Sequence, residues 1–194
     1  MFNEKSSATD RIDAGMASNN QTQEGASAFG RYLIECRDAD GNLKWSEDVG
    51  NTVVTAGVQD INTKYFTGSS YTAAWYLGLI TGPGSGVTIA TTDTMSSHTG
   101  WTESTAYTQT NRPTCTFGTA TTANPSVISN SSSTATFSIN ATTTIAGSFL
   151  TSSNTKGGTT GTLVSAAKFQ APGDRAVVSG DTLTVTYTFS LTGS

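Results

Sequence analysis

The stretch Asp181–Leu191 constrains the fold more than any other part of the chain, because its side chains alternate strictly in polarity. Apolar residues occupy every second position from Leu183 to Leu191, and Thr or Ser fills the positions between them. Successive side chains of a β-strand point to opposite faces, so a period of two is the signature of a strand. This segment is therefore predicted to be a strand with one buried and one solvent-facing side.

The composition extends this prediction to the whole chain. Charged residues make up 12% of the 194 residues, against about 25% in an average domain, and Thr, Ser, Gly and Asn replace them. Thr favours strands, whereas Gly and Asn favour turns. A chain of this length fits one domain of ordinary size.

Further strands are predicted from alternating or apolar runs bounded by turn residues, and the turn Asp38–Asn42 joins the first two of them into a hairpin. Val58, Ile61, Tyr65 and Phe66 fall at helical spacing, which predicts one amphipathic helix near 56–66 that caps an open end of a sheet. A single helical turn is expected at 94–98. The predicted strands are 31–37, 43–49, 74–80, 113–117, 134–139, 144–150, 162–169 and 181–191.

These elements predict an all-β fold, a two-sheet β-sandwich of jelly-roll type with one short helix. The sandwich is expected to span residues 29–194. Residues 1–28 have few apolar side chains among Ser, Asn, Gln and Gly, so they cannot offset their own ordering entropy. They are predicted to form an extended N-terminal arm that a neighbouring molecule orders.

Charge is distributed unevenly. Residues 1–60 contain five Lys or Arg and ten Asp or Glu, whereas residues 61–194 contain five and four. A chain without a basic patch is not expected to bind nucleic acid. The sequence also lacks a run of about 18 apolar residues and a signal peptide at its start, so we expect no membrane partner and synthesis in a cytoplasm. A nearly neutral, hydroxyl-rich surface suits close packing against neighbouring molecules.

Candidate catalytic residues are isolated in the sequence. His98, the only histidine, lies near Asp93, Ser96 and Ser97, but no nucleophile-elbow sequence accompanies it. We expect His98 and Trp101 to pin a loop to the body. Glu103, Asp174 and Asp181 would be the acids of a glycoside hydrolase, yet no pair of facing strands is predicted to present them beside aromatic sugar platforms. No catalytic residue is predicted. A hydrolase therefore ranks below the two non-enzymatic functions considered at the end of this section.

No metal or cofactor site is predicted either. The run Asp38-x-Asp40-Gly41-Asn42 resembles the start of a calcium loop, but Val49 stands where the twelfth-position Glu should be. A hairpin turn with solvated carboxylates is favoured. Cys36 and Cys115, the only cysteines, are predicted to be buried free thiols rather than a disulfide.

Aromatic residues allow two interpretations. A carbohydrate-binding face is one of them, but the position of Trp45 and Trp75 in their strands favours packing in the core. The aromatic residues considered are Trp45, Trp75, Trp101, Tyr71, Tyr76 and Tyr107.

Five segments resemble small structural proteins of tailed bacteriophages. The similarity spans roughly residues 31–191, and the segment Asp93–Glu103 is the most specific part of it. The segments are Arg37–Trp45, Trp75–Ile80, Asp93–Glu103, Asn111–Pro113 and Gly180–Val185.

The resemblance implies a non-enzymatic capsid decoration or cement protein of the virion, which binds the outer surface of the shell and braces it. The implied partner is the major capsid protein, with self-association as a dimer or trimer. The alternative is a tail-associated or receptor-binding module that recognises host glycan, in the manner of a fibre or adaptor. The residues expected to contact the capsid are Phe2, Arg11, Ile12 and Met16 in the arm and Phe29 at its end.

Overall fold

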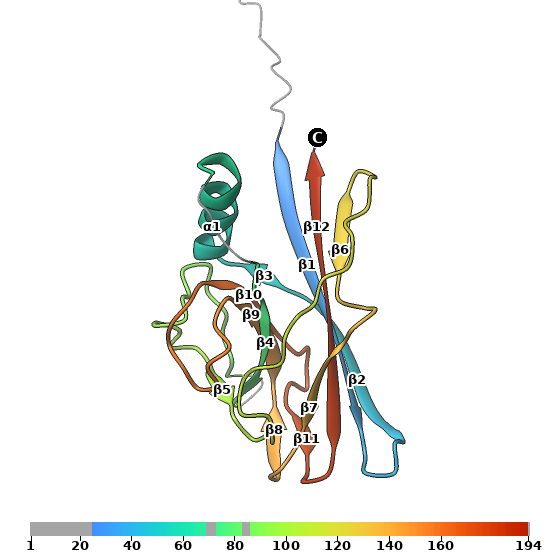
Figure 1. Cartoon of the computed structure of the whole chain (residues 1–194). Helices are drawn as coiled ribbons and strands as arrows, with labels where there is room; N and C mark the ends of the chain where they lie inside the picture. The colour runs from blue at the N-terminus through green and yellow to red at the C-terminus, as the bar shows by residue number, and fades with distance from the viewer. Residues whose placement is uncertain (1–24, 69–72, 83–85, 194) are drawn as a thin grey trace, which may run out of the picture.

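The computed structural model describes residues 25–68, 73–82 and 86–193. The fold is an all-β sandwich with one helix among the described residues, as predicted (Figure 1). The strands of both sheets pair antiparallel. The first sheet runs in the order β2 (Leu43–Gly50), β1 (Ala26–Arg37), β12 (Thr182–Gly193), β6 (Ser126–Ser129), and β7 (Ala135–Ser138) also pairs with β12.

The second sheet faces the first. Its strands run in the order β3 (Thr52–Val53), β10 (Leu163–Lys168), β9 (Gly147–Thr151), β4 (Tyr76–Thr81) and β5 (Thr102–Ser104). A separate two-stranded ladder joins β8 (Thr143–Ile145) and β11 (Arg175–Val177). Helix α1 (Thr55–Phe66) packs beside β10 at one end of the sandwich.

Strand β12 confirms the alternation from which the fold was predicted. It pairs with β1 over its full length, from Ala26 opposite Gly193 to Arg37 opposite Thr182. Leu183, Val185 and Tyr187 are fully buried. The hairpin that joins β1 to β2 also forms as predicted, with Gly41 at a φ of 87° in its turn, a conformation that favours glycine.

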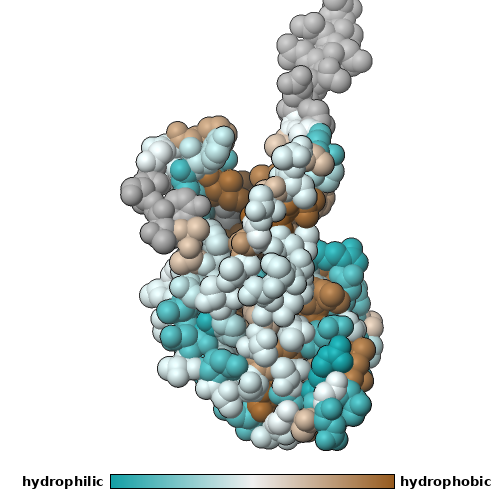
Figure 2. All heavy atoms as spheres, turned by 45° about the vertical axis from the view of Figure 1, so that its right-hand side comes forward, coloured by the Kyte–Doolittle hydropathy of each residue, from teal (hydrophilic) through white to brown (hydrophobic). Residues whose placement is uncertain are grey.

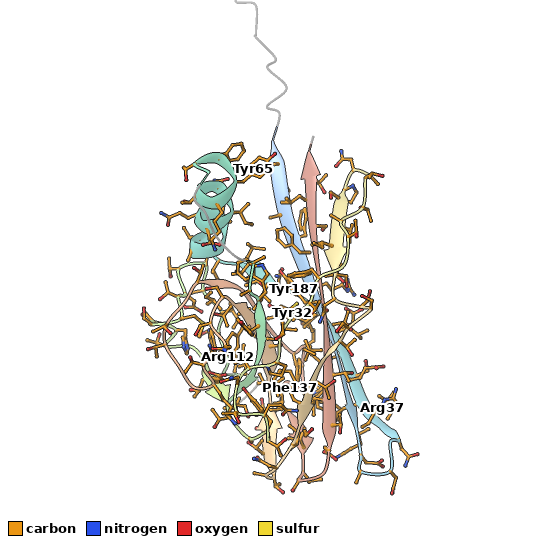
Figure 3. The ribbon with its side chains drawn as sticks, viewed as in Figure 1. Tyr32, Arg37, Tyr65, Arg112, Phe137 and Tyr187 are labelled. Atoms are coloured by element: carbon orange, nitrogen blue, oxygen red, sulfur yellow. The ribbon has the colours of Figure 1, made fainter. Side chains whose placement is uncertain are left out.

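The core lies between the two sheets, and a polar cluster fixes their alignment. The rings of Tyr32 from β1 and Tyr187 from β12 have centroids 4.6 Å apart. The Ser165 hydroxyl of β10 lies 2.8 Å from the Tyr32 hydroxyl and donates to the Tyr187 hydroxyl at 3.1 Å. Figure 3 shows both tyrosines and Phe137 between the sheets, with Arg37 exposed at the lower end. The hydroxyls of Tyr32 and Tyr187 therefore have a partner across the core.

The predicted strand 144–150 is two strands in different sheets. The break falls at Ala146, whose amide donates to the carbonyl of Ile80, and at Gly147. A Cβ atom at Gly147 would lie 2.0 Å from the carbonyl oxygen of Ala167. The close approach of β10 thus requires glycine here, and the chain crosses from one sheet to the other at this point.

Two other local predictions are corrected. The segment 94–98 does not form a helical turn, because Thr94 and Ser97 exchange backbone hydrogen bonds in a small two-residue turn. The segment 113–117 is extended and bonds to the start of β4, through Leu77 N to Pro113 O and Cys115 N to Trp75 O, but it forms an isolated bridge rather than a strand. Twelve strands occur in the described residues, against the eight ranges predicted from the sequence.

Helix α1 occupies the predicted range, but its apolar residues are not buried as an amphipathic helix requires. The helix approaches β10 through Gly57, where a Cβ atom would lie 2.5 Å from the carbonyl oxygen of Val164. Val58, Tyr65 and Phe66 are exposed. The face of α1 that packs on the sheet is therefore a small one, and part of the apolar stripe stays uncovered.

Candidate binding surface

The outer side of the first sheet is a broad surface that neither the second sheet nor α1 covers. Because Leu183, Val185 and Tyr187 point into the core, the residues between them point outward. We call this surface, made of the outward side chains of β1, β2, β6, β7 and β12, the open face. Its hydroxyl row on β12 and β7 consists of Thr136, Thr182, Thr184, Thr186, Thr188, Ser190 and Thr192.

The charges of the open face neutralise each other in pairs. Arg31 on β1 forms an ion pair with Asp48 on β2, and this contact raises the pKa of the Arg31 guanidinium. Arg37 lies 3.8 Å from the carboxylate of Glu35. Little net charge therefore has to be desolvated when this surface meets another. In Figure 2, which brings this side forward, much of the surface is pale, with teal hydrophilic and brown hydrophobic patches beside it.

Two apolar side chains of β1 stand among these hydroxyls. Phe29 and Leu33 on β1 point outward and are 59% and 38% exposed, opposite Ser190 and Thr186 of β12. Phe29 was predicted as a contact residue from the sequence. Leu33 was not predicted as a contact residue. It lies four residues after Phe29 on the same strand and so points to the same face, which the sequence alone could have indicated.

The other predicted contact residues lie in the first 24 residues. Phe2, Arg11, Ile12 and Met16 are outside the described part of the chain. Strand β1 begins at Ala26, so residues 26–28, which were assigned to the arm, belong to the sheet. Whatever precedes Gly25 is attached at the end of the strand that carries Phe29 and Leu33.

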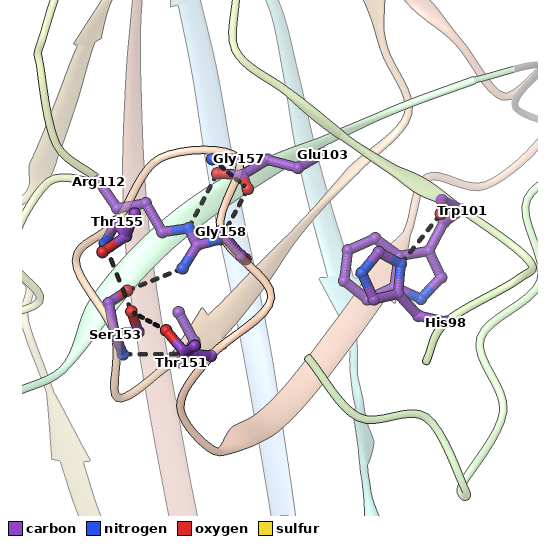
Figure 4. A network of polar contacts seen from close by, with 10 residues as sticks. His98, Trp101, Glu103, Arg112, Thr151, Ser153, Thr155, Gly157 and Gly158 are labelled. Carbon is purple, nitrogen blue, oxygen red and sulfur yellow. Dashed lines mark hydrogen bonds and ion pairs between the residues drawn. The ribbon is translucent and has the colours of Figure 1, made fainter. Parts of the chain in front are cut away.

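Glu103 is held in a buried ion pair. Arg112 donates from Nε to Glu103 Oε1 at 2.9 Å and from Nη2 to Oε2 at 2.7 Å (Figure 4). The same guanidinium donates to the carbonyl oxygens of Ser153 and Gly158 at 2.9 and 2.7 Å. This pair ties strand β5 to the 153–158 loop. The sequence prediction missed Arg112 as the partner of Glu103.

His98 and Trp101 pin a loop, as predicted. Their rings stack with centroids 3.8 Å apart, and His98 Nδ1 donates to the Trp101 carbonyl oxygen at 3.1 Å. The indole Nε1 of Trp101 donates to Asp93 at 2.9 Å, and Asp93 also accepts from the Ala90 amide. The histidine is engaged with the backbone of its own turn (Figure 4).

The two remaining candidate carboxylates, Asp181 and Asp174, differ in their contacts. Asp181 is 2% exposed and accepts from Lys44 Nζ at 2.6 Å and from the Val178 amide at 2.9 Å. The contact with Asp181 raises the pKa of Lys44. Asp174 Oδ1 is buried without a hydrogen-bond partner among the described residues, and the neighbouring Arg175 pairs with Glu47 of β2. Glu103 and Asp181 thus contact different basic side chains, Arg112 and Lys44, and do not share a partner as a catalytic pair of carboxylates would share a substrate.

The segment that resembles a calcium loop is a hairpin turn, as predicted. Asp38 Oδ1 accepts from the amides of Asn42 and Asp40 at 2.8 and 3.0 Å. These bonds, led by that of Asn42, lower the pKa of Asp38. The carboxylate therefore closes its own turn.

The cysteines and tryptophans confirm the predicted core positions. Cys36 and Cys115 are buried free thiols, and burial raises their pKa to about 11 and about 12. Trp101 is buried, whereas Trp45 and Trp75 pack partly buried against the core. Tyr71 lies outside the described residues.

Within the described residues, no helix has the length and apolarity that crossing a membrane demands. Comparison with known proteins adds no relationship. No protein-family model matches this chain, and no curated protein or solved structure is similar to it.

Proposed function

We propose that this chain is a non-enzymatic structural protein of a tailed-bacteriophage virion, which decorates the outer surface of the capsid shell and stabilises it. In this proposal the open face lies against the major capsid protein. The observation that carries the proposal is the open face itself, a sheet surface of hydroxyls and paired charges with Phe29 and Leu33 exposed among them.

The chemistry of the open face favours a broad partner. Hydroxyl groups exchange hydrogen bonds with water for hydrogen bonds with a partner at little net cost, and the loss of ion solvation is small because the charges are already paired. Exposed apolar side chains within such a surface are the usual anchors of an interface. Phe29 and Leu33 are in this position, on a strand that has a neighbour on either side.

In this proposal residues 1–24 add to the same contact. Because β1 starts at Ala26 and carries both anchors, residues 1–24 are attached at the end of the open face. An arm that orders on binding gains contact area across the seams between capsid subunits. The contribution of each copy is repeated over the whole shell.

The first test is the ratio of this protein to the major capsid protein in purified virions, measured by quantitative mass spectrometry. We expect at least one copy for every few capsid subunits. A small fixed number of copies per particle would instead indicate a tail-associated or receptor-binding module. Absence from the particle would refute a virion role.

The second test locates the contact on the protein. Thr186→Lys places an unpaired charge next to Leu33 on the open face, where Thr186 is half-buried. Thr159→Lys is the matched control in an exposed loop between β9 and β10. We expect purified capsids to bind the control fully and the Thr186 variant weakly. Equal binding would exclude the open face as the contact surface.

A deletion tests the arm separately. Removing residues 2–24 leaves β1 intact, because the strand begins at Ala26. We expect a folded domain, verified by circular dichroism, with reduced occupancy on capsids. Full occupancy of the deleted form would show that the arm is not required.

A further inference from the structure

The first sheet projects beyond the second at one end of the molecule. Strands β1 and β12 are 12 residues long, whereas β9 and β10 opposite them have 5 and 6. The inner face of the projecting part has no strand across from it among the described residues, and only α1 stands on the other side (Figure 1). Leu191, which continues the buried row of β12, is consequently 42% exposed.

A hollow of about 170 Å³ lies between α1 and the projecting strands. Its walls are apolar, and brown hydrophobic atoms mark it in the notch of Figure 2. We call it the end groove. Its lining includes Ile61 from α1, Trp75 ahead of β4, Phe117, Ile128 from β6, and Tyr187 and Phe189 from β12.

A pair of aromatic side chains stands beside this groove. Tyr65 and Phe66, at the end of α1, are 79% and 76% exposed, and their rings pack edge to face with centroids 4.9 Å apart. Tyr65 shares a second hollow with Ile61 and Trp75, both of which also line the end groove. In Figure 3, Tyr65 lies at the upper end of the helix on the side of β1. A protruding aromatic pair and an apolar groove thus occupy the same end of the molecule.

We propose that this end is a two-fold interface between copies of the chain, in which Tyr65 and Phe66 of each copy insert into the end groove of the other. A two-fold axis brings the same surface of both copies together, so a protrusion next to a groove becomes self-complementary. This inference does not rest on the proposed function.

The charge of this end is compatible with self-association. The projecting segments 26–30, 126–129 and 186–193 contain no charged residue. On α1, Asp60 and Lys64 form an ion pair of 2.8 Å. Two copies that each carry a net charge of −4 therefore meet at a surface with no unpaired charge on these segments.

The area is sufficient for a small stable interface. An aromatic side chain buries roughly 150–250 Å², so Tyr65 and Phe66 together supply about half of the roughly 800 Å² per partner found in standard interfaces. The uncovered apolar atoms of α1 and β12 supply more. The aromatic pair is already fixed on a helix, so its insertion costs little conformational entropy.

The test is the mass in solution of the full-length chain, measured by size-exclusion chromatography with light scattering across a dilution series. We expect a species of twice the chain mass of 20.1 kDa. The double variant Tyr65→Gln with Phe66→Gln should run as a monomer at the same concentrations, because Gln keeps the helix propensity and removes the apolar contact. Leu43→Gln, an exposed apolar residue at the opposite end, is the matched control and should remain dimeric.

A second variant separates the arm from the aromatic pair. Full-length chain with Ile12→Ser and Met16→Ser should remain dimeric. A wild-type monomer at every concentration, a dimer that persists in the Tyr65 and Phe66 variant, or a dimer that is lost only in the arm variant would each overturn the proposal.

Discussion

Replacing Glu103 by Gln should destabilise the fold strongly, because it leaves a buried positive charge without its counterion. The side chain of Arg112 has 0% exposure and that of Glu103 has 8%. The substituted amide would keep the shape and one hydrogen-bond acceptor but lose the negative charge. Removing one partner of a buried ion pair costs about 3–5 kcal/mol, and we expect the lower end because Arg112 keeps the carbonyls of Ser153 and Gly158.

A loss of about 3 kcal/mol lowers the Tm of a domain of this size by roughly 10 °C. The measurement is thermal unfolding followed by circular dichroism, with a urea titration to check that the unfolding transition stays two-state. Glu35→Gln is the matched control, since Glu35 pairs with Arg37 at 3.8 Å on the surface. The loss of that exposed pair should change the stability by less than about 1 kcal/mol.

A double variant makes the test sharper. Arg112→Met removes the other charge, and the combination Glu103→Gln with Arg112→Met removes both. We expect the double variant to be less destabilised than the sum of the two single variants, because neither charge is left unpaired. If Glu103→Gln and Glu35→Gln shift the Tm equally, the structural role given to Glu103 is wrong. A rise in stability on losing Glu103 would instead be typical of a catalytic carboxylate.

Three further outcomes follow from the fold. Gly147→Ala should lower stability by several kcal/mol in a urea titration, because its Cβ would meet the Ala167 carbonyl at 2.0 Å, whereas Gly50→Ala has nothing within 4 Å and should change it by less than about 0.5 kcal/mol. Cys36 and Cys115 should resist a thiol reagent at pH 8 until the protein is unfolded, since burial raises their pKa to about 11 and about 12. Stability should also fall as the pH rises above 9.0, the ordinary pKa of these thiols, towards 11 and beyond, because the unfolded chain then loses protons that the folded chain keeps. A urea midpoint that is unchanged between pH 8 and pH 11 would contradict this.

The strands and turns that the sequence predicted correctly are those whose signal lies in neighbouring residues. The alternation at 181–191 is enough to locate β12 and its buried side, and Asp38–Asn42 is enough to locate the hairpin turn, because both signals reside in neighbouring residues. The break at Gly147 depends on the approach of Ala167, twenty residues away in the chain. An isolated glycine within a strand pattern can mark a close backbone approach, but Gly147 does not reveal which residue approaches or that the chain changes sheets there.

The predictions that failed or were missed concern tertiary partners. Arg112 lies in a segment without regular structure, and its burial against Glu103 follows from how the loops close rather than from any spacing. The exposure of Tyr65 and Phe66 has a similar origin. Helical spacing predicts an apolar stripe, but whether a sheet covers it depends on the relative lengths of the strands in the two sheets.

The two uncovered surfaces differ in chemistry, and this difference argues for different partners. The end groove is apolar and adjoins an exposed aromatic pair, which is characteristic of long-lived contacts between identical chains. The open face is made of hydroxyls and paired charges, which is characteristic of contacts between proteins that also exist apart.

The groove lies on the inner side of the projecting sheet and the open face on its outer side, so one copy can use both at once. A dimer formed through the grooves would then present two open faces to a shell, and the affinity of the pair would exceed that of either copy alone. The Tyr65 and Phe66 variant should therefore bind capsids more weakly than the wild type although its open face is unchanged, and equal binding at low concentration would separate the two proposals.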